Sequence, residues 1–159
     1  MQELLDHCAG CPRAAYAPGE FLLREGERSG RLLVLAEGCV EVCRDEVEIA
    51  RIEDPGALFG EMAMLLDVPH TASVRAMTAV AAYVIDRPTE YLAAHAELAL
   101  PIARLLARRL QNVTGYLVDL KRQYADRDDH LAMVDEVLET LTHEQGRAFI
   151  PAAELPAEP

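Results

Sequence analysis

The sequence predicts a mainly β fold with α, in which a β sandwich or jelly-roll barrel is followed by a long helix and a short additional helix. The first half of the chain consists of short runs rich in valine, isoleucine and leucine, separated by glycine and proline. These runs recur every ~8–12 residues, which is typical of antiparallel β folds and not of βαβ units. The second half carries apolar residues at helical spacing instead.

The predicted strands end at residues that favour turns, including Pro18-Gly19, Ser29-Gly30, Gly38 and Pro55-Gly56. No internal repeat or low-complexity segment interrupts this pattern. The strand segments are expected at 20–26, 31–44 (broken at Gly38), 47–53, 72–78 and 81–87.

The helical half begins near Thr89, which is expected to cap a short helix that ends at His95. A long helix is predicted over 97–125, with Pro101 in its first turn, where a missing N–H costs little. The predicted organisation is therefore a barrel over 1–96, the long helix over 97–125, an additional helix over 126–145 and a fraying tail over 146–159.

Apolar side chains recur along the long helix at alternating steps of three and four residues. This 3.5-residue repeat indicates a seam against a partner helix, and we expect a homodimer. The alternative is one amphipathic helix packed on its own barrel, which would need a broader apolar face. Whether the additional helix extends the dimer or folds back stays open. The expected dimer interface consists of Leu106, Leu110, Val113, Leu117, Leu120 and Tyr124.

Composition excludes several classes of protein. The net charge of −12 argues against a free-standing nucleic-acid binder, which usually carries a basic face. No run approaches the ~20 apolar residues that a membrane span needs. The N-terminal "MQELLDHC" lacks the features of a signal peptide, so a cytoplasmic protein is expected. No nucleophile–base pair or metal triad is evident, and we expect neither an enzyme nor a metal protein.

Four cysteines leave one alternative open. Cys8 and Cys11 form a CxxC beside His7, which is compatible with a redox-active pair or one corner of a metal site. They are equally compatible with ordinary helix or turn residues in a reduced cytosol. Cys39 and Cys43 lie four apart in a predicted strand and do not form a compact pair of ligands.

Residues 56–76, "GALFGEMAMLLDVPHTASVRA", have the features of a phosphate cradle. Gly60 opens a short helix, where backbone can approach a ligand closely and free N–H groups suit a phosphate. Glu61 would repel a phosphate and suits a sugar hydroxyl instead. His70, Thr71 and the N–H groups that follow can converge on the same point after the turn at Pro69. The alternative is an ordinary loop.

The stretches "PGEFLLREGERSGRLLVLAEGCVEV" and "GALFGEMAMLLDVPHTASVRAMT", followed by a long helix, resemble the cyclic-nucleotide-binding domain. That domain occurs in regulators of the CRP/FNR superfamily, in kinase regulatory subunits and in gated channels. The resemblance covers roughly residues 16–124 and implies a jelly-roll (double-stranded β-helix) barrel. It also implies that the long helix closes over the base and forms a dimer. We do not expect the family's DNA-binding helix-turn-helix in the residues that follow the long helix.

The resemblance assigns roles within residues 56–76, here called the cassette. Glu61 would accept the ribose 2′-hydroxyl, while the N–H groups of Gly60, Glu61 and Met62 and the Thr71 hydroxyl would hold the phosphate of cAMP or cGMP. An arginine pairs with that phosphate in the family, and this chain has His70 there. The implied ligand-binding residues are Phe59, Gly60, Glu61, Met62, His70, Thr71 and Ala72.

His70 is the one departure from the cassette pattern. A mostly neutral imidazole cannot copy the bidentate guanidinium, and losing one charge-assisted hydrogen bond costs roughly ten- to a hundredfold in affinity. Arg75 lies five residues after His70, so its side chain is expected on the opposite face of the strand from that of His70. We therefore predict weak binding that improves below about pH 6.5, where an unperturbed imidazole becomes charged.

The sequence thus favours a regulatory module that binds a cyclic nucleotide without a cofactor and signals through its dimer helix to a protein partner. No direct contact with nucleic acid or membrane is expected. His70 favours a first alternative, a dimeric interaction module that no longer binds nucleotide. Cys8 and Cys11 favour a second, a redox or metal sensor.

Overall fold

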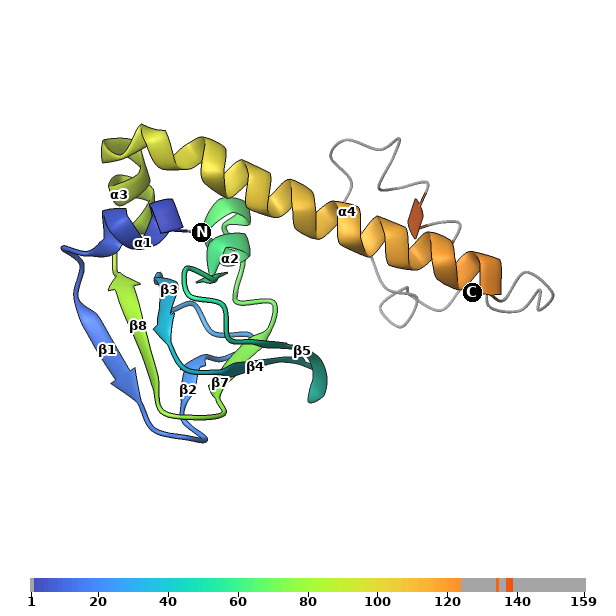
Figure 1. Cartoon of the computed structure of the whole chain (residues 1–159), viewed down its shortest axis with the longest axis horizontal. Coiled ribbons are helices and arrows are strands. Elements are labelled where there is room, and N and C mark those ends of the chain that lie inside the picture. Colours follow the sequence, from blue (N-terminus) through green and yellow to red (C-terminus); the bar gives the residue numbers. More distant parts are fainter. Residues whose placement is uncertain (1, 124–133, 135–136, 139–159) are drawn as a thin grey trace, which may run out of the picture. The chain divides into compact units, whose positions relative to one another are not determined.

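The structure is a computed structural model that describes residues 2–123, 134 and 137–138 of the 159-residue chain. It divides into two compact units, Met1–Ile102 and Ala103–Pro159, and the boundary falls inside the long helix. All of the described strands belong to the first unit (Figure 1). No helix among the described residues has both the length and the apolar character needed to cross a membrane.

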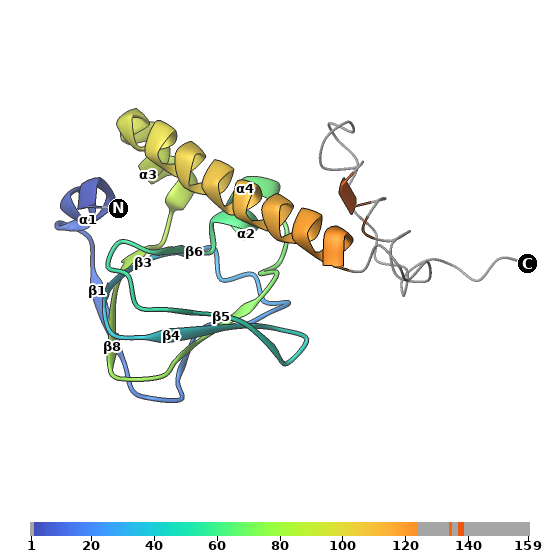
Figure 2. The ribbon, with the colours of Figure 1, turned by 45° about the vertical axis from the view of Figure 1, so that its right-hand side comes forward.

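Eight strands form two antiparallel sheets of four strands each, which confirms the predicted jelly-roll-like fold. One sheet has the order β1-β8-β3-β6 and the other the order β2-β7-β4-β5. The two sheets face each other across the core, as both views show (Figures 1 and 2). The strands are β1 (Arg13–Tyr16), β2 (Phe21–Leu23), β3 (Leu32–Glu37), β4 (Val40–Arg44), β5 (Val47–Ile52), β6 (Leu58–Phe59), β7 (Ser73–Ala76) and β8 (Val80–Ile85).

The core forms because apolar residues from both sheets point inward. β7 shows the alternation expected of a half-buried strand, with Val74 and Ala76 buried, whereas four consecutive residues of β3 are buried. The buried cluster comprises Leu22, Leu23, Leu33, Leu35, Val40, Ala57, Phe59, Val74, Ala76, Val80, Ala82 and Val84.

The predicted break at Gly38 separates β3 from β4. Gly38 has φ +97°, and a Cβ there would lie 2.4 Å from the carbonyl oxygen of Ala79, so only glycine fits this turn. Sequence analysis did not predict β1 and β6, because four and two residues are too few to show a periodic pattern.

Four α-helices and one 3-10 helix are described: α1 (Gln2–Cys8), α2 (Glu61–Leu66), α3 (Pro88–Ala94), η1 (Ala96–Leu98) and α4 (Ala99–Gln123). α1 and α3 lie at the same end of the barrel (Figures 1 and 2), where the Tyr91 hydroxyl donates to the carbonyl oxygen of His7 at 2.8 Å.

Two helix boundaries differ from the prediction. Thr89 does not cap α3: Arg87 occupies the N-cap, and Pro88 takes the first helical position, for which its fixed φ is suited. The long helix begins at Ala99, because the three preceding residues form η1 around the buried Leu98. Tyr124, most of the expected helix over 126–145 and the tail over 146–159 lie outside the described residues.

Candidate functional site

Strand pairing places the cassette beside the loop between β2 and β3 (residues 24–31, the β2–β3 loop). β3 and β6 pair with Leu33 opposite Phe59, so the residues just before β3 lie next to the residues just after β6. Gly60 has φ +89°, and a Cβ on it would lie 2.6 Å from the carbonyl oxygen of Arg31. The cassette can approach this loop so closely only because residue 60 is glycine.

Backbone hydrogen bonds join the C-terminal part of the cassette to the same loop. The His70 N–H donates to the Glu27 carbonyl oxygen at 2.9 Å, and the Gly26 N–H donates to the His70 carbonyl oxygen at 2.9 Å. The Glu25 N–H donates to Ser73 Oγ at 3.0 Å. The first two bonds hold residue 70 in one position against the loop, and the third holds Ser73 there.

The His70 side chain is 5% exposed, and its Nε2 lies 2.7 Å from Ser29 Oγ. Burial lowers the pKa of His70 below its ordinary value, and the Glu27 carboxylate opposes this only in part. The Arg31 N–H donates to Ser29 Oγ at 3.2 Å, which leaves the hydroxyl proton of Ser29 available for the imidazole. A neutral imidazole that accepts at Nε2 fits this arrangement.

His70 and Gly60 line a cavity of about 210 Å³. It lies among the β2–β3 loop, α2 and the start of α3, and it is smaller than the ~300–1,000 Å³ of pockets that enclose a whole drug-sized ligand. Its lining residues are Arg28, Ser29, Gly30, Arg31, Gly60, Ala63, Met64, Asp67, Val68, His70, Pro88 and Thr89.

The two arginines of this cavity are held differently. Arg28 Nη1 lies 3.2 Å from Asp67 Oδ1, and its Nη2 donates to the Asp67 carbonyl oxygen at 3.1 Å. Asp67 ends α2 in a left-handed conformation, so Arg28 binds the C-terminal end of that helix. Arg31 Nε donates to Asp86 Oδ1 at 2.9 Å, and both side chains of that pair are more than half exposed.

The other implied ligand residues do not line this cavity. Phe59 belongs to the core, Glu61 is buried, and Met62 is 45% exposed. Thr71 and Ala72 are half-buried. Gly60 and His70 are therefore the two implied residues that the cavity brings together, and the ligand roles of the whole set stay predictions.

The sequence does not identify four neighbours of the cassette: Arg28, Ser29, Arg31 and Thr89. The contact between Ser29 and His70 joins residues 41 positions apart, and no motif spacing spans that interval. In the sequence, Ser29-Gly30 indicates a turn and Arg31 begins the predicted strand 31–44; the two arginines that flank Ser29-Gly30 are the chemical signal that could have marked this loop.

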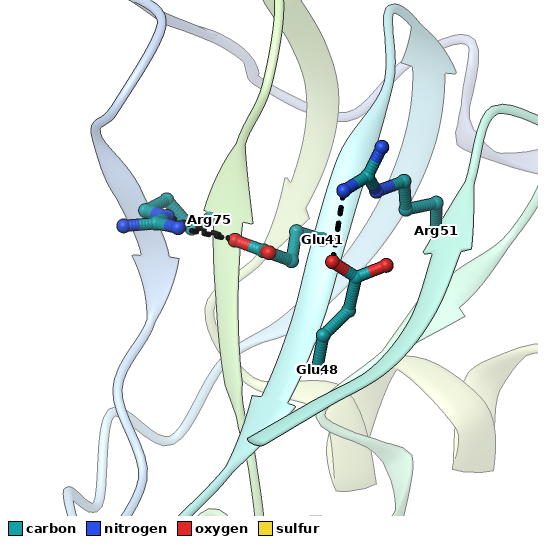
Figure 3. A network of polar contacts seen from close by, with 4 residues as sticks. All are labelled: Glu41, Glu48, Arg51 and Arg75. Atoms are coloured by element: carbon teal, nitrogen blue, oxygen red, sulfur yellow. Dashed lines mark hydrogen bonds and ion pairs between the residues drawn. The ribbon is translucent and has the colours of Figure 1, made fainter. Parts of the chain in front are cut away.

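Arg75 points away from the core, as expected. Its guanidinium binds the carboxylate of Glu41 on the outer face of the β2-β7-β4-β5 sheet, with Nε 3.0 Å from Oε2 (Figure 3). Arg51 and Glu48 pair nearby on β5 at 2.9 Å. Arg75 is therefore engaged on that face.

Replacing Glu41 with glutamine is expected to lower the urea midpoint of unfolding at pH 7. The hydrogen bond from Arg75 lowers the pKa of Glu41, so its contribution to stability is present above the ordinary carboxyl pKa and is lost as pH falls through the lowered value. The deficit of Glu41→Gln relative to the wild type should therefore shrink from pH 5 toward pH 3. Urea unfolding of both proteins at several pH values between 3 and 7 measures this deficit.

Glu37→Gln is the matched control, because it neutralises the carboxylate of a more exposed pair, with Arg13, where ion pairs contribute little. A deficit of Glu41→Gln that is the same at pH 3 and pH 7 would contradict the ionic origin and indicate lost packing.

Cys8, near the N-terminus, does not have the environment of a reactive cysteine. Cys8 is fully buried, and burial together with Cys11 raises the pKa of its thiol to about 11. Its thiolate, the nucleophilic form, is therefore scarce at neutral pH. All four cysteines are free, and the described residues contain no group of three or more His, Cys, Asp or Glu placed to hold a metal ion.

Comparison with known proteins gives a consistent result. Residues 13–90, which include most of the barrel and the entire cassette, match the family described as the cyclic nucleotide-binding domain. The crystal structure of the Thermus thermophilus catabolite activator protein superposes with a TM-score of 0.64 at 27% identity, over 76% of this chain and 60% of that chain.

Two curated relatives are similar in sequence. The cGMP-dependent protein kinase egl-4 of Caenorhabditis briggsae is 39% identical over 69 residues, which are 43% of this chain and 9% of the kinase. The CRP-like cAMP-activated global transcriptional regulator of Mycobacterium tuberculosis is 31% identical over 108 residues, or 64% of this chain and 48% of the regulator. The chain thus spans about half of the regulator and a small part of the kinase.

Proposed function

Because residues 13–90 belong to the cyclic nucleotide-binding domain family, we propose that this protein is a regulatory module that binds cAMP or cGMP. The observation that carries the proposal is the junction of the cassette with the β2–β3 loop. There Gly60, in a conformation that favours glycine, and the buried His70 line one cavity of about 210 Å³. Both curated relatives described above have names that refer to a cyclic nucleotide.

We propose that the module transmits its signal through α4. α4 carries the 3.5-residue apolar repeat, and Leu110 and Val113 on that repeat are 48% and 52% exposed in the single chain. Large apolar side chains at such spacing are suited to pack against a second copy of the same helix. We infer a homodimer through α4 that passes the signal to a protein partner, without catalysis by this chain.

Calorimetric titration with cAMP and cGMP at pH 5.5 and pH 8 tests nucleotide binding. Burial keeps His70 neutral in the free protein, and a bound phosphate raises its pKa. Affinity should therefore rise as pH falls through the pKa of the complex and level off below the pKa of the free protein. The lowered pKa shifts the expected improvement below the pH 6.5 of an unperturbed imidazole. We expect a gain of up to roughly tenfold at pH 5.5.

Two substitutions at position 70 make this test specific. His70→Arg should raise affinity at pH 8 by roughly ten- to a hundredfold, because it restores a permanent charge. His70→Gln keeps a polar group near Ser29 but cannot titrate, so the pH dependence should disappear. Absence of binding at both pH values by the wild type and His70→Arg alike would refute the proposal and favour a nucleotide-independent interaction module.

A further inference from the structure

We propose that Arg31 supplies the guanidinium that holds the cyclic phosphate in this chain, in place of an arginine at position 70. The inference rests on the proposed function and names a residue outside the cassette. Arg31 is the last residue before β3 and lines the cavity together with Gly60 and His70.

The backbone of Arg31 is part of the wall of the cavity. Its carbonyl oxygen lies 2.6 Å from the position that a Cβ of residue 60 would take. Its N–H donates to the Ser29 hydroxyl, which in turn contacts His70 Nε2. The antiparallel register of β3 and β6 fixes this position, since Leu33 pairs with Phe59 and Val34 with Leu58. The side chain of Arg31 therefore starts from a fixed point beside Gly60.

The charges around the cavity leave Arg31 as the cation most readily available to a ligand. The Asp67 carboxylate on the wall is already paired with Arg28, which also binds the Asp67 carbonyl oxygen. The neutral His70 offers no charge at pH 7. Arg31 has one ion pair, with Asp86, and the two side chains are 54% and 61% exposed. The Arg28–Asp67 pair is also exposed, at 59% and 100%, so exposure does not separate the two arginines. What separates them is that Asp67 holds Arg28 by two contacts, whereas Asp86 holds Arg31 by one, through Nε. A phosphate can therefore compete for the guanidinium of Arg31 at the smaller cost.

The size and chemistry of the cavity agree with this role. About 210 Å³ accommodates the charged group of a nucleotide rather than a complete nucleotide. A guanidinium binds two oxygens of a phosphate at once, and the Thr89 hydroxyl in the lining of the cavity offers a further neutral donor. Arg31 would thus restore the type of contact that His70 does not provide.

Three single substitutions separate this role from a structural one. Arg31→Gln should weaken binding of cAMP or cGMP by roughly ten- to a hundredfold at pH 8. Arg24→Gln is the matched control, because it removes a guanidinium from the same loop but outside the lining of the cavity, and it should change affinity less than threefold. Asp86→Asn should leave affinity unchanged or raise it, because it frees Arg31 from its present partner.

A purely structural role predicts a different pattern, since Arg31→Gln and Asp86→Asn break the same ion pair and would then weaken binding alike. The double variant His70→Arg with Arg31→Gln adds a second readout. It should recover most of the lost affinity, because the guanidinium at position 70 takes over the contact.

The outcomes distinguish this inference from the proposed function. If the wild type binds a cyclic nucleotide and Arg31→Gln binds as well as Arg24→Gln does, the role of Arg31 is refuted and the proposed function stands. If neither the wild type nor His70→Arg binds cAMP or cGMP, both fall together. Thermal unfolding of each variant checks that a loss of affinity does not reflect a loss of folded protein.

Discussion

Replacing Gly60 with alanine is expected to lower the free energy of unfolding by about 2–4 kcal/mol and to reduce cyclic-nucleotide binding below detection. The residue has φ +89°, a conformation that costs a non-glycine residue roughly 1–2 kcal/mol. The added Cβ would also lie 2.6 Å from the carbonyl oxygen of Arg31. That atom belongs to the backbone of a loop that two hydrogen bonds tie to His70, so it cannot move independently.

Gly30→Ala separates the clash from the conformational strain. Gly30 has φ +65° on the same loop, and a Cβ there would meet no atom within 4 Å. Gly30→Ala should lower the free energy of unfolding only by the backbone strain, roughly 1–2 kcal/mol. Urea unfolding measures the difference in the free energy of unfolding between the two variants. Titration with cyclic nucleotide measures whether each variant still binds it. Equal losses of stability in Gly30→Ala and Gly60→Ala would contradict the close approach of the cassette to Arg31.

Replacing Leu117 with glutamate is expected to convert a dimer into a monomer. Leu117 lies in the middle of the expected interface on α4, and burying an unpaired carboxylate against a second helix costs several kcal/mol. Light scattering coupled to gel filtration should give the wild type about twice the 17.5 kDa mass of one chain. The variant should give the mass of a single chain at micromolar concentration.

Asn112→Glu is the matched control for this experiment. It introduces the same side chain on the same helix, at an exposed position about 140° around the axis from Leu117. It should remain a dimer, and both variants should keep their helical circular dichroism. A dimer of unchanged mass in Leu117→Glu would rule out the α4 seam as the interface.

The barrel was predictable because its strands are punctuated by residues with special backbone requirements. Gly38 marks a break that the structure confirms, and the alternation in residues 73–76 follows directly from the pleat of a half-buried strand. The short strands β1 and β6 were missed, since they form through pairing with β8 and β3 and not through any pattern of their own.

The cassette was also predictable as a segment, because glycine, acid, short helix and proline turn are consecutive in the chain. The residues that surround the cassette in space were not predictable from the sequence. Ser29 and Arg31 reach Gly60 and His70 only because β3 pairs with β6 and β2 pairs with β7, which brings the loop before β3 against both ends of the cassette. Sequence spacing does not encode a contact between residues 41 positions apart.

The sequence by itself therefore determined the fold class, the position of the cassette and the histidine that replaces its arginine, since each of these is a local property of the chain. Only the tertiary structure decided that His70 is buried against Ser29 and that Arg31, which pairs with Asp86, lines the same cavity. Burial and charge at a site depend on what surrounds a side chain in space, and strand register supplies those surroundings.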